Sequence, residues 1–360
     1  MRRDVLASLA GKGSAKRPSK ETLNHPGLLR LASGIDPRED TRASYQAAYW
    51  RLGIDIVNRV PLENASEPLG PGEVVDLGNG YRKTPLGLYD SLCRHVYPFK
   101  DVEEFWAAGH LDLDYHSLRT PVPHDLDPDD IRLRETALGE AGVYYCQLYT
   151  TLFMWGVEYL GWEVFMLAAM EDPAGFKEKF LDPACAASLG LIEQLCSAEC
   201  PFVFLHDDLA DARGPIFPPP WYDKYILPRY EGLLEPVRRA GKKAVFVADG
   251  NMAHFLRPLR ELGFDGVMFE NPATDFTLIL ETFHDRFVIG GADTGLLTFG
   301  APEEIRLQVA EVARLTAGLP GFALSSPGGL HGNIPLPNLE AYFDARVAAG
   351  FTPELWRAGR

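Results

Sequence analysis

Residues 202–208 (FVFLHDD) and residues 244–251 (AVFVADGN) share one pattern, a short apolar run that ends abruptly in acidic residues. Runs of this length, rich in Val and Phe, are typical of strands buried on both faces of a parallel sheet. The segment between them, residues 222–239, has helical spacing. A strand, a helix and a second strand in this order predict a parallel sheet with helical crossovers.

The same rhythm continues along the chain in both directions. Further β-like runs lie at residues 54–57, 142–148, 266–270, 287–290 and 321–325, and further helical segments at residues 41–52, 255–262 and 302–317. Seven of the eight strands of a closed barrel are therefore identifiable, and we predict an α/β fold of the (β/α)8 TIM-barrel type. An open doubly wound sheet is the alternative. No Gly-x-Gly-x-x-Gly opens a βα unit, which disfavours dinucleotide binding.

The chain is expected to form one domain with an N-terminal extension. Residues 1–40 are polar and rich in Lys, Ser, Pro and Gly, so they are predicted to be a leader, and residues 41–360 are predicted to be the barrel. With 360 residues, 46% of them hydrophobic, the chain can bury one large core. Residues 73–85 predict a hairpin that turns at Asn79-Gly80, and residues 121–132 an acidic, proline-rich connection.

The net charge of the chain limits the classes of partner that it is expected to bind. The formal net charge is −15, from 50 acidic and 35 basic residues. So acidic a surface repels nucleic acid and anionic membranes, which leaves a small-molecule substrate as the expected partner. The substrate could still be an anion if it meets a local basic site.

Cysteine content and hydropathy indicate the compartment. The five cysteines are few, odd in number and scattered, so no disulfide framework is expected and a reducing compartment fits. No apolar run of signal-peptide length follows the N-terminus, and none reaches the roughly 18 residues of a membrane span. We expect a cytoplasmic protein, for which a homodimer is an open alternative.

Polar residues gather where the predicted strands end. In a (β/α)8 barrel these ends meet at one rim, where reactive residues lie. Five successive strands deliver carboxylates, amides or imidazoles there. We predict catalytic roles for His206, Asp208 and Asp249. Substrate-binding roles are predicted for Asp207, Arg213, Asn251, Glu270, Asn271, Asp293, His331 and Asn333.

Each of these residues also has a purely structural interpretation. The Asp207-Asp208 pair could cap the next helix or pair with Arg213, and Asp249 could belong to an ordinary turn before Gly250. Glu270 could simply end a strand before Pro272, and His331 could be a solvated loop residue. The aromatic run at residues 149–155 could line a substrate pocket or form helix core.

Several segments resemble the uroporphyrinogen decarboxylase superfamily. Asp-Asp-Leu at 207–209, followed by Arg-Gly-Pro at 213–215 and Leu-Pro-Arg-Tyr at 227–230, is similar to that family's Asp-Asp strand end and following helix. Residues 245–251 lie where the family has a strand ending in a Cys-Gly-Asn-like turn. Residues 160–163, 171–173 and 335–339 match as well, so the resemblance covers roughly residues 41–350 and implies the barrel fold.

The resemblance implies one of two reaction classes. True uroporphyrinogen decarboxylases carry an N-terminal arginine-rich segment, and no Arg-Gln-Ala-Gly-Arg-like run is present here. The chain therefore resembles more closely the branch of corrinoid-dependent and coenzyme M methyltransferases. Those enzymes bind zinc through His-x-Cys and a late Cys, and the zinc activates a thiol. Here Val247 and Asp249 occupy the His-x-Cys positions, and the late Cys falls within residues 326–329, which contain none.

Three hypotheses follow from this pattern. The first is a methyltransferase-like enzyme for a small methylated or aromatic substrate, with a corrinoid protein as an optional partner and His206 as the acid–base residue. The second is a decarboxylase in which Asp208 or Asp249 stabilises a cationic intermediate; it would require arginines near the acidic rim, of which Arg213 and Arg229 are the candidates. The third is a non-catalytic barrel. If zinc or another divalent metal is bound, Asp249 and His206 are the expected ligands, because oxygen and imidazole ligands suit harder sites.

Overall fold

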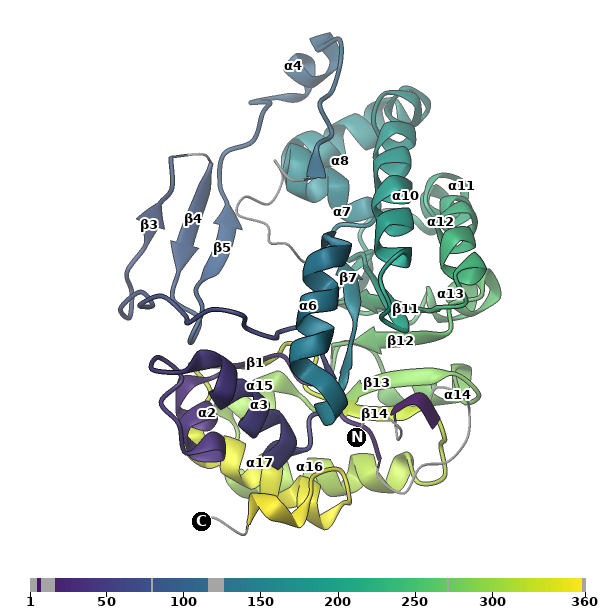
Figure 1. Cartoon of the computed structure of the whole chain (residues 1–360). Helices are drawn as coiled ribbons and strands as arrows, with labels where there is room; N and C mark the ends of the chain where they lie inside the picture. The colour runs from purple at the N-terminus through teal and green to yellow at the C-terminus, as the bar shows by residue number, and fades with distance from the viewer. Residues whose placement is uncertain (1–4, 8–16, 79, 116–125, 271, 358–360) are drawn as a thin grey trace.

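A parallel β-sheet of six strands forms the centre of the molecule (Figure 1). The computed structural model describes residues 5–7, 17–78, 80–115, 126–270 and 272–357. Neighbouring strands in the sheet are all parallel, which confirms the predicted α/β architecture. In spatial order the strands are β14 (Phe322–Ser325), β13 (Phe287–Gly291), β12 (Gly266–Phe269), β11 (Lys243–Ala248), β8 (Phe202–His206) and β7 (Cys146–Leu148).

Strands β2 (Ile56–Val57) and β6 (Val143–Tyr144) form a second parallel pair. One residue separates β6 from β7, so this pair continues directly into the edge strand of the central sheet. Between β14 and β2 lies the segment Ser19–Lys20. It forms two isolated bridges, Ser19 with Leu324 and Lys20 with Ile56. Lys20 N donates to Leu324 O over 2.9 Å, and Ile56 N to Ser19 O over 3.0 Å. Regular strand pairing is therefore not continuous around a closed barrel in the described part of the chain.

The central sheet is strongly curved. The rings of Phe202 on β8 and Phe287 on β13 have centroids 5.5 Å apart, although two strands separate β8 from β13. In a flat sheet these strands would lie about 14 Å apart. Alternate residues of successive strands form one buried apolar cluster on the concave side: Ile56, Val143, Tyr145, Phe202, Phe204, Val245, Val247, Met268, Phe287, Ile289 and Ala323, joined by Val5. A separate and larger cluster packs the sheet against the helices.

The helices surround this sheet (Figure 1). Their bounds are α2 (Pro26–Ser33), α3 (Thr41–Leu52), α4 (Val102–Ala107), α6 (Pro128–Leu138), α7 (Phe153–Trp155), α8 (Trp162–Glu171), α9 (Pro173–Phe176), α10 (Asp182–Cys196), α11 (Pro219–Tyr225), α12 (Leu227–Arg239), α13 (Leu256–Leu262), α14 (Phe276–Thr282), α15 (Thr294–Phe299), α16 (Pro302–Leu315) and α17 (Leu336–Ala348). The helix predicted at residues 41–52 is α3, which the Asp40 side chain caps at its start. The single helix predicted at residues 222–239 is wrong: it is divided into α11 and α12, because Pro228 has no N–H to donate to the preceding turn.

A small antiparallel sheet projects from the body of the molecule (Figure 1). Its strands are β3 (Val75–Asp76), β4 (Tyr81–Thr84) and β5 (Ser91–Arg94). The pairing of β3 with β4 confirms the predicted hairpin. Asn79 of the predicted turn lies outside the described residues, as does most of the predicted acidic connection at residues 121–132.

Residues 17–40, within the predicted leader, pack against the C-terminal part of the chain. Strand β1 (Leu23–Asn24) pairs in parallel with β15 (Leu330–His331). The buried Glu21 carboxylate accepts hydrogen bonds from Arg346 Nη1 over 2.7 Å and from the Tyr342 hydroxyl over 2.8 Å. The domain boundary at residue 40 remains a prediction. Strands β9 (Ala210–Asp211) and β10 (Gly214–Pro215), which follow β8 in the chain, form a two-stranded antiparallel ribbon.

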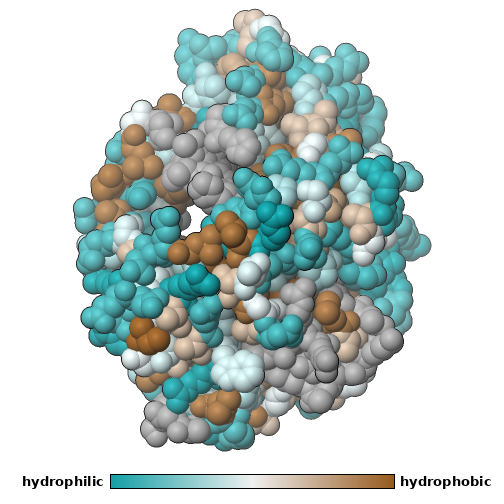
Figure 2. Space-filling view, viewed as in Figure 1, coloured by the Kyte–Doolittle hydropathy of each residue, from teal (hydrophilic) through white to brown (hydrophobic). Residues whose placement is uncertain are grey.

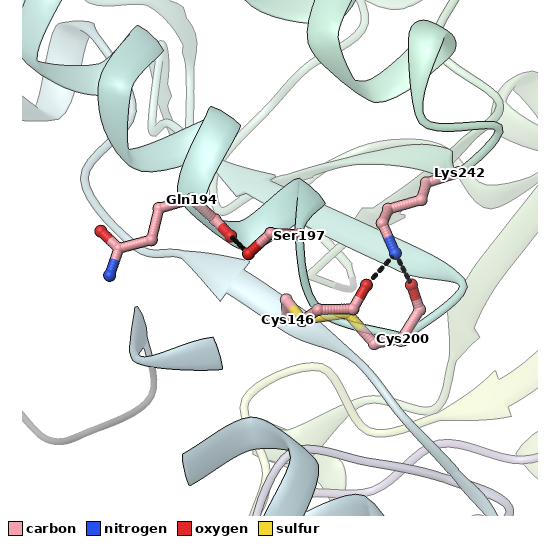
Figure 3. The surroundings of a disulfide bond; sticks show 6 residues. Cys146, Gln194, Ser197, Cys200 and Lys242 are labelled. Carbon is pink, nitrogen blue, oxygen red and sulfur yellow. Dashed lines mark hydrogen bonds between the residues drawn. A yellow bond between two sulfur atoms is a disulfide. The ribbon is translucent and has the colours of Figure 1, made fainter. Parts of the chain in front are cut away.

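One disulfide joins Cys146 of β7 to Cys200, which lies just before β8 (Figure 3). The Lys242 ammonium donates a 2.7 Å hydrogen bond to the Cys200 carbonyl beside it. Cys93, Cys185 and Cys196 are free. The expectation of no disulfide framework did not anticipate this one bond, because the two cysteines are 54 residues apart and meet only when β7 pairs with β8.

Hydrophilic residues cover most of the face seen in Figure 2, and hydrophobic ones form small groups. Among the described residues, no helix has the length and apolar character needed to cross a membrane.

Candidate active site at the carboxyl ends of the strands

Three of the predicted residues meet where β8 and β11 end. His206 is the last residue of β8, and Asp249 directly follows β11. One ligand-capable atom each from His206, Asp208 and Asp249 lies within 4.8 Å of the others. His206 Nε2 is 3.2 Å from Asp208 Oδ1, and that same oxygen accepts from Asp249 N over 2.8 Å. We call these three residues, together with Glu270, the acidic cluster.

The turn after Asp249 requires a glycine. Gly250 has φ of +80°, and a Cβ there would lie 2.3 Å from Ala210 O. Positive φ is accessible to glycine at little cost. The close approach of β9 therefore explains the Asp-Gly-Asn sequence and fixes where Asp249 leaves the strand.

Glu270 extends the cluster from the end of β12. Its carboxyl shares a hydrogen bond with the Asp249 side chain. Partial burial, followed by the negative charges of Asp249, Asp208 and Asp293, raises the pKa of Glu270 to about 7. Burial and the charge of Asp208 also raise the pKa of Asp249, although its side chain reaches solvent. Two carboxyl groups this close favour sharing one proton.

His206 is buried, with 4% of its surface exposed. Burial by itself would lower the pKa of the imidazole, but the hydrogen bond and charge of Asp208, the Tyr149 carbonyl and the charge of Asp249 outweigh it, and the pKa is raised. His206 Nδ1 donates to Tyr149 O over 2.7 Å, which directs Nε2 toward Asp208.

Tyr149 is a site residue that the sequence analysis did not single out. Its ring stacks on that of His206, with centroids 4.4 Å apart. In the same aromatic run, Phe153 and Trp155 are buried core residues. The later residues of the run therefore form core, while Tyr149 covers the imidazole. A role of the run in lining a substrate pocket stays a prediction.

A glycine-rich loop after β14 lies against Glu270. A Cβ at Gly328 would be 2.6 Å from Glu270 Oε1 and 2.8 Å from Thr294 Oγ1. Thr294 Oγ1 is in turn 2.9 Å from Ser326 Oγ. The Gly328 carbonyl accepts a 2.5 Å hydrogen bond from His331 Nε2, so His331 belongs to the same loop.

Asp207 has a different environment from its neighbour Asp208. It is fully buried, and its carboxylate accepts from Phe153 N over 2.9 Å, from Met154 N over 2.7 Å and from the Tyr230 hydroxyl. These bonds hold the start of α7, which precedes β8 in the chain, so Asp207 supports a helix other than the following one that was considered. Burial raises the pKa of Asp207 to about 6 despite these bonds.

The remaining predicted residues lie in varied surroundings. Asp293 caps α15 by accepting from Gly295 N, and it is close enough for its charge to act on Glu270. Asn251 accepts from Ala253 N. Arg213 is 91% exposed and paired with Asp211, and Arg229 is paired with Asp182. Asn333 is exposed, and Asn271 lies outside the described residues. Arg213 and Arg229 are thus engaged elsewhere and do not supply the arginines that the decarboxylase hypothesis requires.

The donor atoms of the acidic cluster do not fit thiolate-bound zinc. Cys146 and Cys200 form the disulfide, and His206, Asp208 and Asp249 present one nitrogen and several oxygens. This set suits a harder divalent ion. The bond from His206 Nδ1 to a backbone carbonyl is of the kind that orients metal-binding imidazoles.

Comparison with known proteins gave matches of two kinds. A family model described as "Uroporphyrinogen decarboxylase (URO-D)" matches residues 152–348. Among solved structures, a methyltransferase from Methanosarcina mazei is similar with a TM-score of 0.64 and 19% identity, over 96% of this chain and 98% of that one. A sugar phosphate isomerase/epimerase from Parabacteroides distasonis aligns over 94% of this chain and 98% of its own, at 12% identity and a TM-score of only 0.37. A search of curated proteins returned no match.

Proposed function

The chain belongs to the uroporphyrinogen decarboxylase family, and from this premise we propose that it is a methyltransferase-like enzyme acting on a small methylated or aromatic substrate. The observation that carries the proposal is the acidic cluster, in which His206 and two carboxyl groups with raised pKa meet at the carboxyl ends of neighbouring parallel strands. The similarity in fold to a protein described as a methyltransferase supports the choice of reaction.

The proposal includes a (β/α)8 barrel. Seven strand segments follow one another in parallel from β2 through β6–β7 to β14, and Ser19–Lys20 lies between the first and the last of them as an eighth. The curvature that brings Phe202 to Phe287 also favours a barrel. In this fold the carboxyl ends of the strands are where substrates react.

In the proposed reaction His206 is the proton donor. The bond between the methyl group and its oxygen breaks, the methyl group passes to the acceptor, and the oxygen that keeps the bonding electrons takes a proton from His206 Nε2. Asp208 holds the imidazole charged and in place. The Glu270–Asp249 pair, which shares one proton near neutral pH, returns a proton to the site. A corrinoid carried by a partner protein would supply the methyl acceptor.

Turnover with a free corrinoid tests the proposal directly. A panel of methoxyphenols and other small methyl ethers would be incubated with cob(I)alamin, and formation of methylcobalamin followed by absorbance. His206→Ala and Asp249→Ala are expected to lower the rate by 10²-fold or more, as loss of a proton donor does. The exposed His284→Ala is the matched control. If His206→Ala and Asp249→Ala turn over a confirmed substrate as the unaltered protein does, the site is wrongly assigned.

Metal content separates two versions of the site. If a divalent ion belongs to it, mass spectrometry of the purified protein should find about one equivalent, and Asp249→Ala should lose it, because Asp249 supplies one of the donor groups. Asp293→Asn, which alters a nearby acidic residue outside this donor set, should keep it. If the protein stays metal-free after supplementation with zinc or manganese, the version without a metal holds, in which the side chains alone carry out acid–base chemistry.

Decarboxylation is the second candidate, and one feature favours it: several carboxyl groups converge where a cationic intermediate could be stabilised. Release of carbon dioxide from an aromatic or pyrrolic acid, without methylcobalamin formation, would identify this reaction.

A further inference from the structure

Gln147 is a polar residue on the concave side of β7. Its neighbours Cys146 and Leu148 belong to the larger cluster that packs against the helices, whereas Tyr145 belongs to the concave-side cluster. Because successive residues of a strand point to opposite faces, the Gln147 side chain lies on the same side as Tyr145. It is only partly buried, so solvent reaches it from the concave side.

Two stacked pairs of rings flank Gln147. The Tyr145 ring stacks on that of Phe204, with centroids 4.0 Å apart. The Tyr149 ring stacks on that of His206, with centroids 4.4 Å apart. In the pairing of β7 with β8, Gln147 is in register with Phe204, and His206 lies two residues further along β8. Gln147 therefore lies between the two ring pairs, one layer of side chains below His206.

The side-chain amide of Gln147 can both donate and accept hydrogen bonds, yet it forms none with any other residue that the structure describes. Two other glutamines are partly buried, and each bonds the backbone: Gln46 donates to Ala137 O, and Gln308 accepts from Asp293 N. The amide of Gln147 is thus an unpaired polar group that solvent reaches, and it is available to a ligand.

The interior of the sheet changes from apolar to polar at this layer. On five strands, the second residue after a member of the concave-side cluster is polar: Gln147, His206, Asp249, Glu270 and Ser325. Below Asp249 and Glu270, the apolar residues Val247 and Met268 are each 5% exposed, whereas Phe204 is fully buried. A ligand that enters from the carboxyl ends of the strands would therefore meet an apolar floor with polar groups around it.

We propose that Gln147 determines substrate specificity by hydrogen-bonding a hydroxyl or carbonyl oxygen at the end of an aromatic ring opposite the reacting methoxy group. Two residues along a strand span roughly 6.6 Å, which is comparable with the length of a benzene ring that carries oxygen atoms on opposite carbons. The leaving oxygen then meets His206 Nε2 while the ring rests on Val247 and Met268. The inference rests on the proposed function for the reacting end, but binding at Gln147 can be measured without turnover.

The test is binding of three compounds to the full-length protein: 4-methoxyphenol, 4-methoxybenzaldehyde and 4-methylanisole. They differ only in the group opposite the methoxy group, and ligand-observed NMR gives their affinities. We expect the first two to bind about tenfold more tightly than 4-methylanisole, because it cannot make the hydrogen bond. In protein labelled with 15N-glutamine, only the first two should shift the side-chain NH2 resonances of Gln147, which are assigned by their absence from Gln147→Met.

Variants then show whether Gln147 is responsible for the preference. Gln147→Met keeps the length of the side chain without the amide, so it should bind the three compounds with affinities within about threefold of one another. Gln147→Leu should do the same and replaces it if the methionine variant is unstable. Gln194→Met, at an exposed glutamine of α10 (Figure 3), is the matched control and should keep the preference.

Two further measurements separate this role from the proposed reaction. His206→Gln should retain the preference for 4-methoxyphenol, because binding at Gln147 does not need the proton donor. On a confirmed substrate, Gln147→Met should raise KM more than it lowers kcat, whereas His206→Ala should mainly lower kcat. Absence of methylcobalamin formation together with the expected preference would contradict the proposed reaction and leave the role of Gln147 intact.

The inference is wrong if the unaltered protein binds none of the three compounds, or binds 4-methylanisole as tightly as the other two. It is equally wrong if Gln147→Met or Gln147→Leu keeps the preference of the unaltered protein, or if the Gln147 resonances do not respond to 4-methoxyphenol. If neither variant folds, Gln147 is a structural residue and the inference fails.

Discussion

Glu270 and Asp249 share a hydrogen bond between their carboxyl groups, from the ends of neighbouring strands β12 and β11. Such a bond requires a proton on one of the two, and Glu270, with a pKa of about 7, carries it below neutral pH and loses it above. The pair is therefore a proton store whose state changes within the physiological range.

Replacing Glu270 with Gln should stabilise the protein at alkaline pH. The pKa of Glu270 is raised in the folded state, so between pH 4.5 and 7 the folded protein holds a proton that the unfolded chain has lost, and stability falls as pH rises through this window. Gln cannot ionise and avoids this loss. After allowance for solvent screening we expect a gain of about 1–2 kcal/mol at pH 8 and almost none at pH 4.5, measured by urea unfolding. An equal effect at both pH values would contradict the assigned pKa.

Asp208→Asn should lower the pKa of His206. Burial opposes the charge on this imidazole, and Asp208 supplies the hydrogen bond and the largest charge that overcome it. Without that carboxylate, burial should be the dominant effect, and the pKa of His206 should fall below its ordinary value. NMR titration of the ring in Asp208→Asn and in the unaltered protein would show this. Stability linked to His206 is present below about pH 6.5 and lost as pH rises through the raised pKa, so Asp208→Asn should flatten that dependence.

Asp207 and Asp208 show how much of this site the sequence could predict. The sequence placed both at the rim, because both follow a buried apolar run. Successive residues of an extended chain point to opposite sides, so His206 and Asp208 share one side and Asp207 takes the other. That alternation was available in the sequence and would have separated the two aspartates.

Other features depend on contacts that a sequence pattern does not contain. Ser19–Lys20 lies between β14 and β2, yet the sequence Pro-Ser-Lys at 18–20 gives no apolar run to recognise. Strand β1 pairs with β15 across more than 300 residues of chain. By contrast, the strands themselves were predictable, because burial on both faces demands short runs of Val, Ile, Leu and Phe.

Asp207→Ala should destabilise the fold. The carboxylate is fully buried and serves two backbone N–H groups of α7 and the Tyr230 hydroxyl. Its loss leaves these donors unpaired, for which we expect about 3–4 kcal/mol of unfolding free energy. Tyr230→Phe removes one of the three bonds and should cost less, about 1 kcal/mol. Chemical denaturation of both variants measures the difference, and near-neutral behaviour of Asp207→Ala would refute the structural role.

The Cys146–Cys200 disulfide should contribute to stability under oxidising conditions. It closes a loop across 54 residues, for which the chain-entropy model gives roughly 4 kcal/mol, an upper value for most proteins. Cys200→Ser should therefore lower the unfolding midpoint without reductant, and should match the unaltered protein in dithiothreitol. Cys93→Ser, at an exposed free cysteine, is the control. Mass spectrometry of the unreduced protein that finds five free thiols would rule the bond out.

Gly328→Ala should impair the site more than the fold. The new Cβ would lie 2.6 Å from Glu270 Oε1 and 2.8 Å from Thr294 Oγ1, so either the loop or the glutamate must move. Displacing Glu270 breaks its bond to Asp249, and displacing the loop moves His331, whose Nε2 bonds the Gly328 carbonyl. We expect a loss of turnover of tenfold or more together with a drop in Tm of only a few degrees, since one loop repacks. Gly190→Ala, on α10 with open space around its Cβ position, supplies the comparison and should keep full activity. If Gly328→Ala turns over substrate at the unaltered rate with an unshifted pH profile, the contact between this loop and Glu270 plays no part in the reaction.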